Sequence, residues 1–124
     1  MKILLDTHTF LWFVTADNQL SRKGKNIILD TANTKYISIA TFWEIIIKLS
    51  LKKLKLQVSL DDLYNLKGYE HLNINIQHLL QLQELEFHHR DPFDRIIIAQ
   101  GLSEKMTIVS NEVLFDKYKV KRIW

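Results

Sequence analysis

The chain has 124 residues and a mass of 14.7 kDa, which suits one compact domain that buries about two thirds of its unfolded surface. It contains no cysteine, so disulfides, zinc fingers and a thiol nucleophile are excluded, and its 3 glycines and 1 proline are too few for a linker-rich chain. The formal net charge of +3 is only a weak indication of an anionic partner.

No apolar run approaches the roughly 20 residues that a membrane span needs, and the N-terminal apolar run is interrupted by Asp6 and His8. We therefore expect a soluble, cytoplasmic protein that makes no contact with a membrane.

The first half of the chain alternates between strand and helix patterns. Residues 2–5 form an apolar run that ends at Asp6, which is typical of a buried parallel strand whose end opens into a polar site. Apolar residues at helical spacing follow over 10–14, and Ser21 is placed to cap a second helix. Residues 36–39 are predicted to form the next strand, followed by a helix that Thr41 caps and that extends to Leu49.

The second half continues the alternation. Residues 59–62 open a short helix that ends at Gly68, 71–74 form a strand, and Asn75 caps a helix that extends to Leu85. Asp91 and Pro92 mark the start of a long helix that ends near Lys105. A strand over 107–110, a short helix over 113–118 and a last strand over 120–123 complete the chain. This order predicts an α/β fold with a central parallel sheet flanked by α-helices, in a single domain over 1–124.

Acidic residues follow several of the predicted strands. Asp6 follows the first strand, Glu44 lies in the first turn of the next helix, Asp91 and Asp94 lie in the first turn of the long helix, and Glu112 follows the strand over 107–110. In parallel sheets ligands bind beyond the carboxyl ends of the strands. The five carboxylates are therefore expected to meet at one edge of the sheet.

Each acid also has a structural explanation. The pairs Thr41 with Glu44 and Asp91 with Asp94 have capping-box spacing, and for a single acid helix capping is the commoner role. Asp6 is harder to explain in this way, because a neighbouring threonine could cap the helix and burial of an acid at the end of a strand is costly.

Carboxylates that converge repel one another, and cations relieve this repulsion. Ligands that are all oxygen favour Mg²⁺ or Mn²⁺, and such metals promote phosphodiester hydrolysis. The acids alone therefore indicate a metal-dependent nuclease or phosphatase.

Four motifs are spread along the chain, from the first strand to the last short helix. They are Leu4-Leu5-Asp6-Thr7-His8-Thr9-Phe10-Leu11-Trp12, Ser38-Ile39-Ala40-Thr41-Phe42-Trp43-Glu44-Ile45, Asp91-Pro92-Phe93-Asp94-Arg95-Ile96-Ile97-Ile98-Ala99-Gln100 and Phe115-Asp116-Lys117-Tyr118. Together they resemble the PIN-domain ribonucleases, and most of all the VapC-type toxins of type II toxin–antitoxin modules. The resemblance implies the PIN-like fold, a Mg²⁺- or Mn²⁺-dependent endoribonuclease, a cognate antitoxin protein and a homodimer.

The resemblance also assigns roles to the acids. Asp6, Glu44 and Asp94 match the metal-binding acids of the family, and Asp91 matches an additional catalytic acid of the subgroup. Glu112 matches the fourth metal-binding acid of the family, at a position where related chains usually have Asp.

Three small hydroxyl residues match supporting positions of the family: Thr7, Ser38 and Ser110. Four basic residues beside the acids are candidate RNA contacts, although each has an ordinary alternative as a packed or solvated side chain: His8, Arg95, His89 and Arg90.

Other residues allow two interpretations. Trp12, Phe42 and Trp43 are expected in the core, with base stacking as the less favoured role. The leucines of the segment 49–63 either belong to the core or line a groove for a partner helix or a second copy.

The sequence thus predicts an endoribonuclease that hydrolyses RNA phosphodiester bonds and acts as a toxin paired with an antitoxin. The alternative is a non-catalytic PIN domain that binds RNA or a protein partner. A DNA nuclease or phosphatase with the same metal chemistry is a further enzyme alternative.

Overall fold

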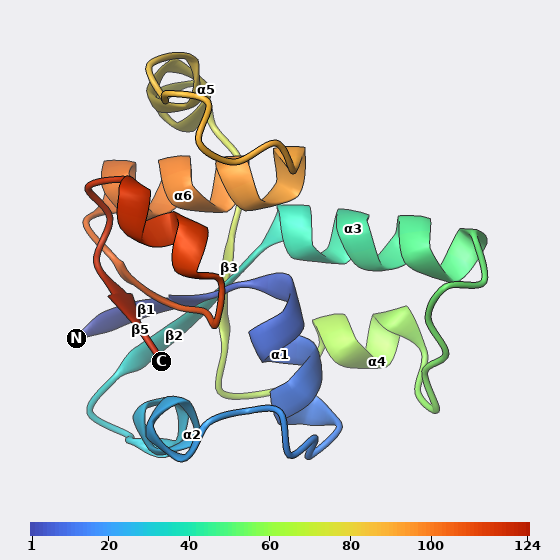
Figure 1. Ribbon diagram of the computed structural model, residues 1–124. Coiled ribbons are helices and arrows are strands. Elements are labelled where there is room, and N and C mark those ends of the chain that lie inside the picture. The colour runs from blue at the N-terminus through green and yellow to red at the C-terminus, as the bar shows by residue number, and fades with distance from the viewer.

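The computed structural model describes residues 1–124 and is built on a five-stranded parallel sheet (Figure 1). Its strands lie in the order β3-β2-β1-β4-β5. Their bounds are β1 (Lys2–Leu5), β2 (Thr34–Ser38), β3 (Glu70–Leu72), β4 (Thr107–Val109) and β5 (Arg122–Ile123). Every neighbouring pair is parallel, so each connection must cross back over the sheet, and helices make these crossings.

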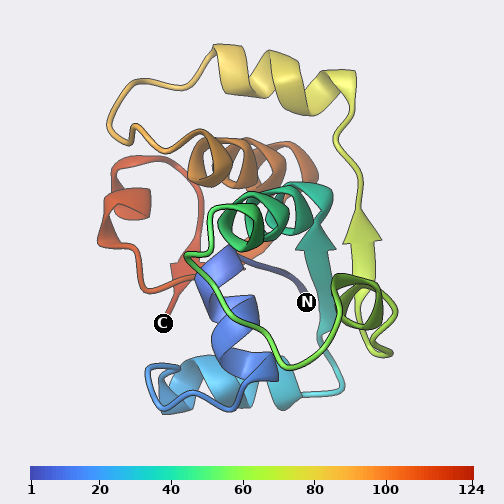
Figure 2. The same ribbon diagram turned by 90° about the vertical axis from the view of Figure 1, so that its right-hand side faces the viewer.

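Six α-helices and one 3₁₀ helix flank the sheet. They are α1 (Thr7–Val14), α2 (Arg22–Leu29), α3 (Ile39–Ser50), α4 (Leu60–Tyr64), α5 (Ile76–Gln83), α6 (Pro92–Glu104) and the 3₁₀ helix η1 (Val113–Lys117). In Figure 1, α5 and α6 lie above the sheet and α1, α2 and α4 lie below it. Figure 2 shows α3 beside α6, with α5 on the outer side of α6. The α/β architecture expected from the sequence is confirmed.

The strands are apolar on both faces because each face is covered. Alternate residues of a strand point to opposite faces, so the two central strands supply two cores. Leu4 and Ile108 pack with α6, whereas Ile3, Leu5 and Val109 pack on the side of α1 and α2. All five of these side chains are fully buried.

The register of the central strands places their carboxyl ends at the same level. Leu5 of β1 lies opposite both Ile37 of β2 and Val109 of β4. Asp6 and Ser110 each come directly after this level, and Ser38 is the last residue of β2. One edge of the sheet therefore gathers polar side chains from three adjacent strands.

Two capping expectations were wrong. The helix after β2 begins at Ile39, and Ser38 caps it by accepting a hydrogen bond from the backbone N–H of Ala40 at 3.1 Å. Thr41 instead lies inside α3 and is buried. Asp6, which the sequence disfavoured as a cap, accepts a hydrogen bond from the N–H of Thr9 at 2.9 Å and caps α1.

The remaining caps agree with the sequence. Ser21, Ser59, Asn75 and Asp91 cap α2, α4, α5 and α6. No helix has both the length and the apolar character needed to cross a bilayer.

The leucine-rich segment after α3 belongs mainly to the core. Leu63 is buried, and the leucines that pack against the same core are Leu49, Leu54, Leu56 and Leu60. Leu51 and Val58 are exposed.

Candidate active site

Five carboxylates meet at the carboxyl edge of the sheet, and we call them the carboxylate cluster: Asp6, Glu44, Asp91, Asp94 and Glu112. They come from the end of β1, from α3, from the start of α6 and from the loop after β4. The charges of the other four all act on Asp94, which places this residue at the centre of the group.

Asp6 is the most deeply buried member, with 2% of its surface exposed. One oxygen accepts the N–H of Thr9, and the other accepts the hydroxyl of Ser110 at 2.5 Å. Burial raises the pKa of Asp6 above its ordinary value, although these hydrogen bonds act in the opposite direction. The carboxylate is therefore held in place but poorly compensated in charge.

Ser110 connects two parts of the cluster. Its Oγ donates to Asp6 and accepts the backbone N–H of Glu112 at 3.0 Å. The guanidinium of Arg122 also donates to the carbonyl of Ser110 at 2.9 Å. The expected supporting position thus links the end of β1 to the loop that carries Glu112.

Glu44 is buried with only part of its charge paired. Its Oε2 lies 3.2 Å from Nζ of Lys48, one turn later in α3. Its Oε1 is buried and has no hydrogen-bond partner. A buried carboxylate oxygen without a partner is costly, so this atom indicates a binding position for a cation or a donor.

Asp91 and Asp94 share the first turn of α6 but differ in their surroundings. Asp91 accepts the backbone N–H groups of Phe93 at 2.8 Å and Asp94 at 3.3 Å, and thus caps the helix. Burial, together with the charges of the other cluster members, raises the pKa of Asp94 to about 8.

The loop before α6 and the loop after β4 both reach Asp94. Nε2 of His89 lies 3.0 Å from Oδ2 of Asp94 and 3.9 Å from Oε2 of Glu112. One atom from each of these three side chains lies within 4.8 Å of the other two. Glu112 also caps η1, where its Oε1 accepts the N–H of Leu114 at 3.3 Å.

The other two supporting residues position helices. The hydroxyl of Thr7 donates to that of Thr41 at 3.2 Å, which joins the starts of α1 and α3 in the interior. Ser38 is fully buried and caps α3, the helix that carries Glu44.

The four candidate RNA contacts divide into two groups. His8 and Arg90 are exposed, whereas His89 and Arg95 are buried. The guanidinium of Arg95 donates to the carbonyls of Leu85, Glu86 and His89 and to the hydroxyl of Tyr118. Arg95 therefore holds the loop between α5 and α6 in place. This arrangement indicates a structural role for Arg95 and not a contact with RNA.

The aromatic residues also differ from one another. Phe42 is buried as expected and Trp12 is half-buried, but 57% of Trp43 is exposed, so its expected core position is wrong. The ring of Trp43 makes an edge contact with Phe93 at a centroid distance of 5.1 Å. Trp43 and Phe93 thus pack across the contact between α3 and α6, the two helices that carry Glu44 and Asp94.

The donor set fits a hard divalent cation. It consists of carboxylate oxygens, it includes the unpartnered Oε1 of Glu44, and its mutual repulsion is relieved by positive charge. Mg²⁺ and Mn²⁺ both prefer such ligands. The three acids that the family resemblance assigns to the metal, Asp6, Glu44 and Asp94, all belong to this cluster.

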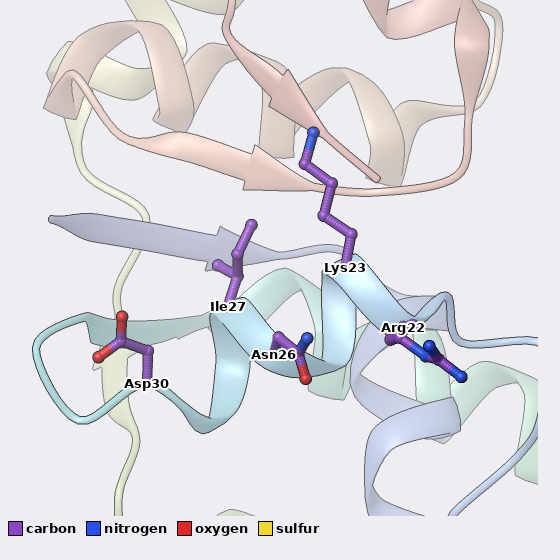
Figure 3. Close-up of a pocket in the computed structure, with 5 residues that line it drawn as sticks. All are labelled: Arg22, Lys23, Asn26, Ile27 and Asp30. Atoms are coloured by element: carbon purple, nitrogen blue, oxygen red, sulfur yellow. The ribbon is translucent and has the colours of Figure 1, made fainter.

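An open hollow on the surface is separate from this cluster. It lies along α2 and is lined by Arg22, Lys23, Asn26, Ile27 and Asp30, as Figure 3 shows. It shares no residue with the carboxylate cluster and is lined mostly by polar side chains.

Sequence analysis assigned no contact within the site to two residues, Lys48 and Tyr118. The pairing of Lys48 with Glu44 could have been found, because the two are four residues apart on one helix. The contact between Tyr118 and the loop before α6 had no local signal, since the partners are 29 and 30 residues apart.

Asp94 is expected to make the metal-free protein less stable as the pH rises. Its pKa of about 8 exceeds the ordinary value of 3.8, so between these values the folded state holds a proton that the unfolded state has released. Stability from this group is therefore greatest at acidic pH and is lost as the pH approaches 8. Asp94→Asn should therefore reduce the fall in melting temperature with rising pH. The measurement is the melting temperature in EDTA from about pH 5 to about pH 8.5, and equal slopes for the two proteins would contradict the account.

Comparison with known proteins agrees with this geometry. The PIN domain model matches residues 3–121. No curated protein sequence matches the chain significantly.

Several solved structures have a similar fold. A chain of VapBC2 from Rickettsia felis, solved with a DNA fragment from its promoter, is 18% identical with a TM-score of 0.75, over 99% of this chain and 98% of that one. A chain of VapBC-1 from nontypeable Haemophilus influenzae is 17% identical with a TM-score of 0.72, over 99% and 97%. A chain of FitAcB from Neisseria gonorrhoeae is 16% identical with a TM-score of 0.70, over 98% and 96%.

The parallel sheet has the PIN-like topology, acids gather at its carboxyl edge, and the family model spans nearly the whole sequence. The chain belongs to the PIN domain family.

Proposed function

We propose that this protein is a Mg²⁺- or Mn²⁺-dependent endoribonuclease and the toxin of a toxin–antitoxin pair. The observation that carries the proposal is the convergence of four other carboxylates around Asp94, with one buried oxygen of Glu44 left unpartnered. PIN domains are generally nucleases, and this cluster supplies the ligand chemistry that such hydrolysis needs.

The chemistry divides between the cation and the chain. A divalent cation at the cluster supplies positive charge that polarises the phosphate and activates water. Asp6, Glu44 and Asp94 hold the cation, while Ser110 fixes Asp6 through its hydroxyl. The cap on α1 fixes the other oxygen of Asp6, so this ligand is oriented before any substrate arrives.

Exposed groups beside the cluster support a single-stranded nucleic acid as substrate. The exposed indole of Trp43 offers a face on which an unpaired base can stack, and such stacking is tolerant of sequence. Exposed Arg90 and His8 flank the acids in sequence and are available to phosphates.

The partner proposal comes from the similar structures. These structures are of VapBC and FitAcB, and the one from Rickettsia felis was solved bound to a DNA fragment from the promoter. By analogy we propose an antitoxin protein as the inhibitor of this chain and action on RNA in the cytoplasm. The homodimer implied by the sequence resemblance stays a prediction.

Asp6→Asn is expected to reduce RNA cleavage by orders of magnitude while preserving the fold. Asparagine is as good a helix cap as aspartate, so α1 keeps its first hydrogen bond, but the charge that a cation needs is removed. The measurement is the initial cleavage rate on single-stranded RNA and DNA oligomers across a Mn²⁺ series, with the melting temperature of each protein.

The matched control is Asp62→Asn, which removes an exposed acid from α4, outside the cluster. The control should cleave at the wild-type rate. If Asp6→Asn kept nearly full Mn²⁺-dependent activity, the site would be misassigned. A wild-type chain whose melting temperature does not respond to Mn²⁺ would favour the non-catalytic alternative.

Glu112 is expected to matter less than Asp6 or Asp94. Its side chain is 38% exposed, and one of its oxygens caps η1, so only the other is free to face the cation. Glu112→Ala should therefore lower the cleavage rate less than Asp6→Asn, and Glu112→Asp should keep or raise it. A loss in Glu112→Ala as complete as that in Asp6→Asn would show that Glu112 is an indispensable ligand.

A further inference from the structure

His89 occupies an unusual position for a histidine. Only 8% of its surface is exposed, and its Nε2 lies between the carboxylates of Asp94 and Glu112. Although Asp94 is 3.0 Å away, Nε2 has no well-aligned hydrogen-bond partner. A buried ring nitrogen that lies between two acids without a hydrogen-bond partner needs an explanation beyond packing.

The other nitrogen of the ring fixes its chemistry. Nδ1 of His89 accepts the backbone N–H of Asp91 at 3.1 Å. A nitrogen that accepts a hydrogen bond carries a lone pair, so in the neutral ring the proton resides on Nε2. The side facing the acids is thus an N–H donor and has no lone pair to offer a metal ion.

The buried side chains of Tyr118 and Arg95 hold the loop that carries His89. Figure 2 shows this loop beside the segment around η1. The hydroxyl of Tyr118 accepts the backbone N–H groups of His88 at 3.0 Å and His89 at 2.9 Å, and donates to the carbonyl of Glu86 at 2.8 Å. Arg95 donates to the carbonyls of Glu86 and His89 from the other side. These contacts fix the backbone of the loop and so limit the positions that the imidazole of His89 can adopt.

We propose that His89 is a positioning residue of the carboxylate cluster: its Nε2–H orients the carboxylates of Asp94 and Glu112 for a cation that His89 itself does not bind. A donor at Oδ2 of Asp94 leaves Oδ1 of the same carboxylate to face the rest of the cluster. Tyr118 and Arg95 act through His89 by fixing its loop. This inference rests on the proposed metal-dependent function.

The proton on Nε2 can be measured without any substitution. In ¹⁵N-labelled wild-type protein, the nitrogen chemical shifts of His89 should show a protonated Nε2 and an unprotonated Nδ1, both in EDTA and after addition of Mg²⁺. A neutral ring with its only proton on Nδ1, or loss of the Nε2 proton when Mg²⁺ is added, would overturn the proposal because Nε2 would then be free to ligate.

Variants test the positioning role through Mn²⁺ affinity and, in parallel, RNA cleavage. His89→Leu should weaken Mn²⁺ binding roughly ten- to hundredfold, the range for groups that orient metal ligands. His89→Gln should recover most of the affinity, because its amide N–H reaches toward the place of Nε2. Tyr118→Phe should also weaken Mn²⁺ binding, although His89 is still present, because the loop loses the hydroxyl that holds it.

The matched control for Tyr118→Phe is Tyr69→Phe, which also removes a tyrosine hydroxyl. Tyr69 packs its ring against Phe10 and Phe13, away from the loop that carries His89. The control should bind Mn²⁺ as the wild type does.

The outcomes separate the two proposals. Wild-type affinity in His89→Leu would overturn the inference, and so would a variant His89→Gln as weak as His89→Leu. If the wild type binds Mn²⁺ and cleaves RNA, and the His89 and Tyr118 variants do so equally well, only the positioning role is contradicted. A wild-type chain that does neither overturns the proposed function, and the inference with it.

Discussion

Repulsion among the carboxylates at one edge of the sheet is the constraint on which the rest of the site depends. Four acids gather around Asp94, and burial together with their charges raises its pKa to about 8. Backbone and hydroxyl donors hold two of the acids in place: Asp6 is held by Thr9 and Ser110, and Asp91 by the first turn of α6. These donors stabilise individual carboxylates but leave the group short of positive charge, as expected of a site built for a cation.

Under the proposed function, the same hydrogen bonds serve both stability and metal binding. Asp6 caps α1 and Asp91 caps α6, so a capping role does not argue against a functional role for these residues. A cap fixes a carboxylate relative to a rigid helix, and a metal site needs fixed ligands. The structural role therefore supports the proposed chemical role, and the sequence argument that opposed the two was too strict for Asp6.

Features that depend on local pattern could be predicted from the sequence, whereas those that depend on tertiary packing could not. The strand ending at Asp6 and the caps at Ser21 and Asn75 follow from apolar runs and neighbouring polar residues. The exposure of Trp43 could not be inferred, because an apolar helix face does not reveal whether another element covers it. The burial of Arg95 was equally hidden, since its acceptors are loop carbonyls and a distant tyrosine hydroxyl.

The central claim is that the carboxylate cluster is a divalent-cation site. Anomalous diffraction from crystals of the protein grown with Mn²⁺ tests it most directly, because the manganese signal locates the ion without reference to activity. The account predicts a peak in contact with carboxylate oxygens of Asp6 and Asp94, with Oε1 of Glu44 directed at the same ion. Saturating Mn²⁺ with no peak at this edge of the sheet, or a peak only at surface acids elsewhere, would contradict it.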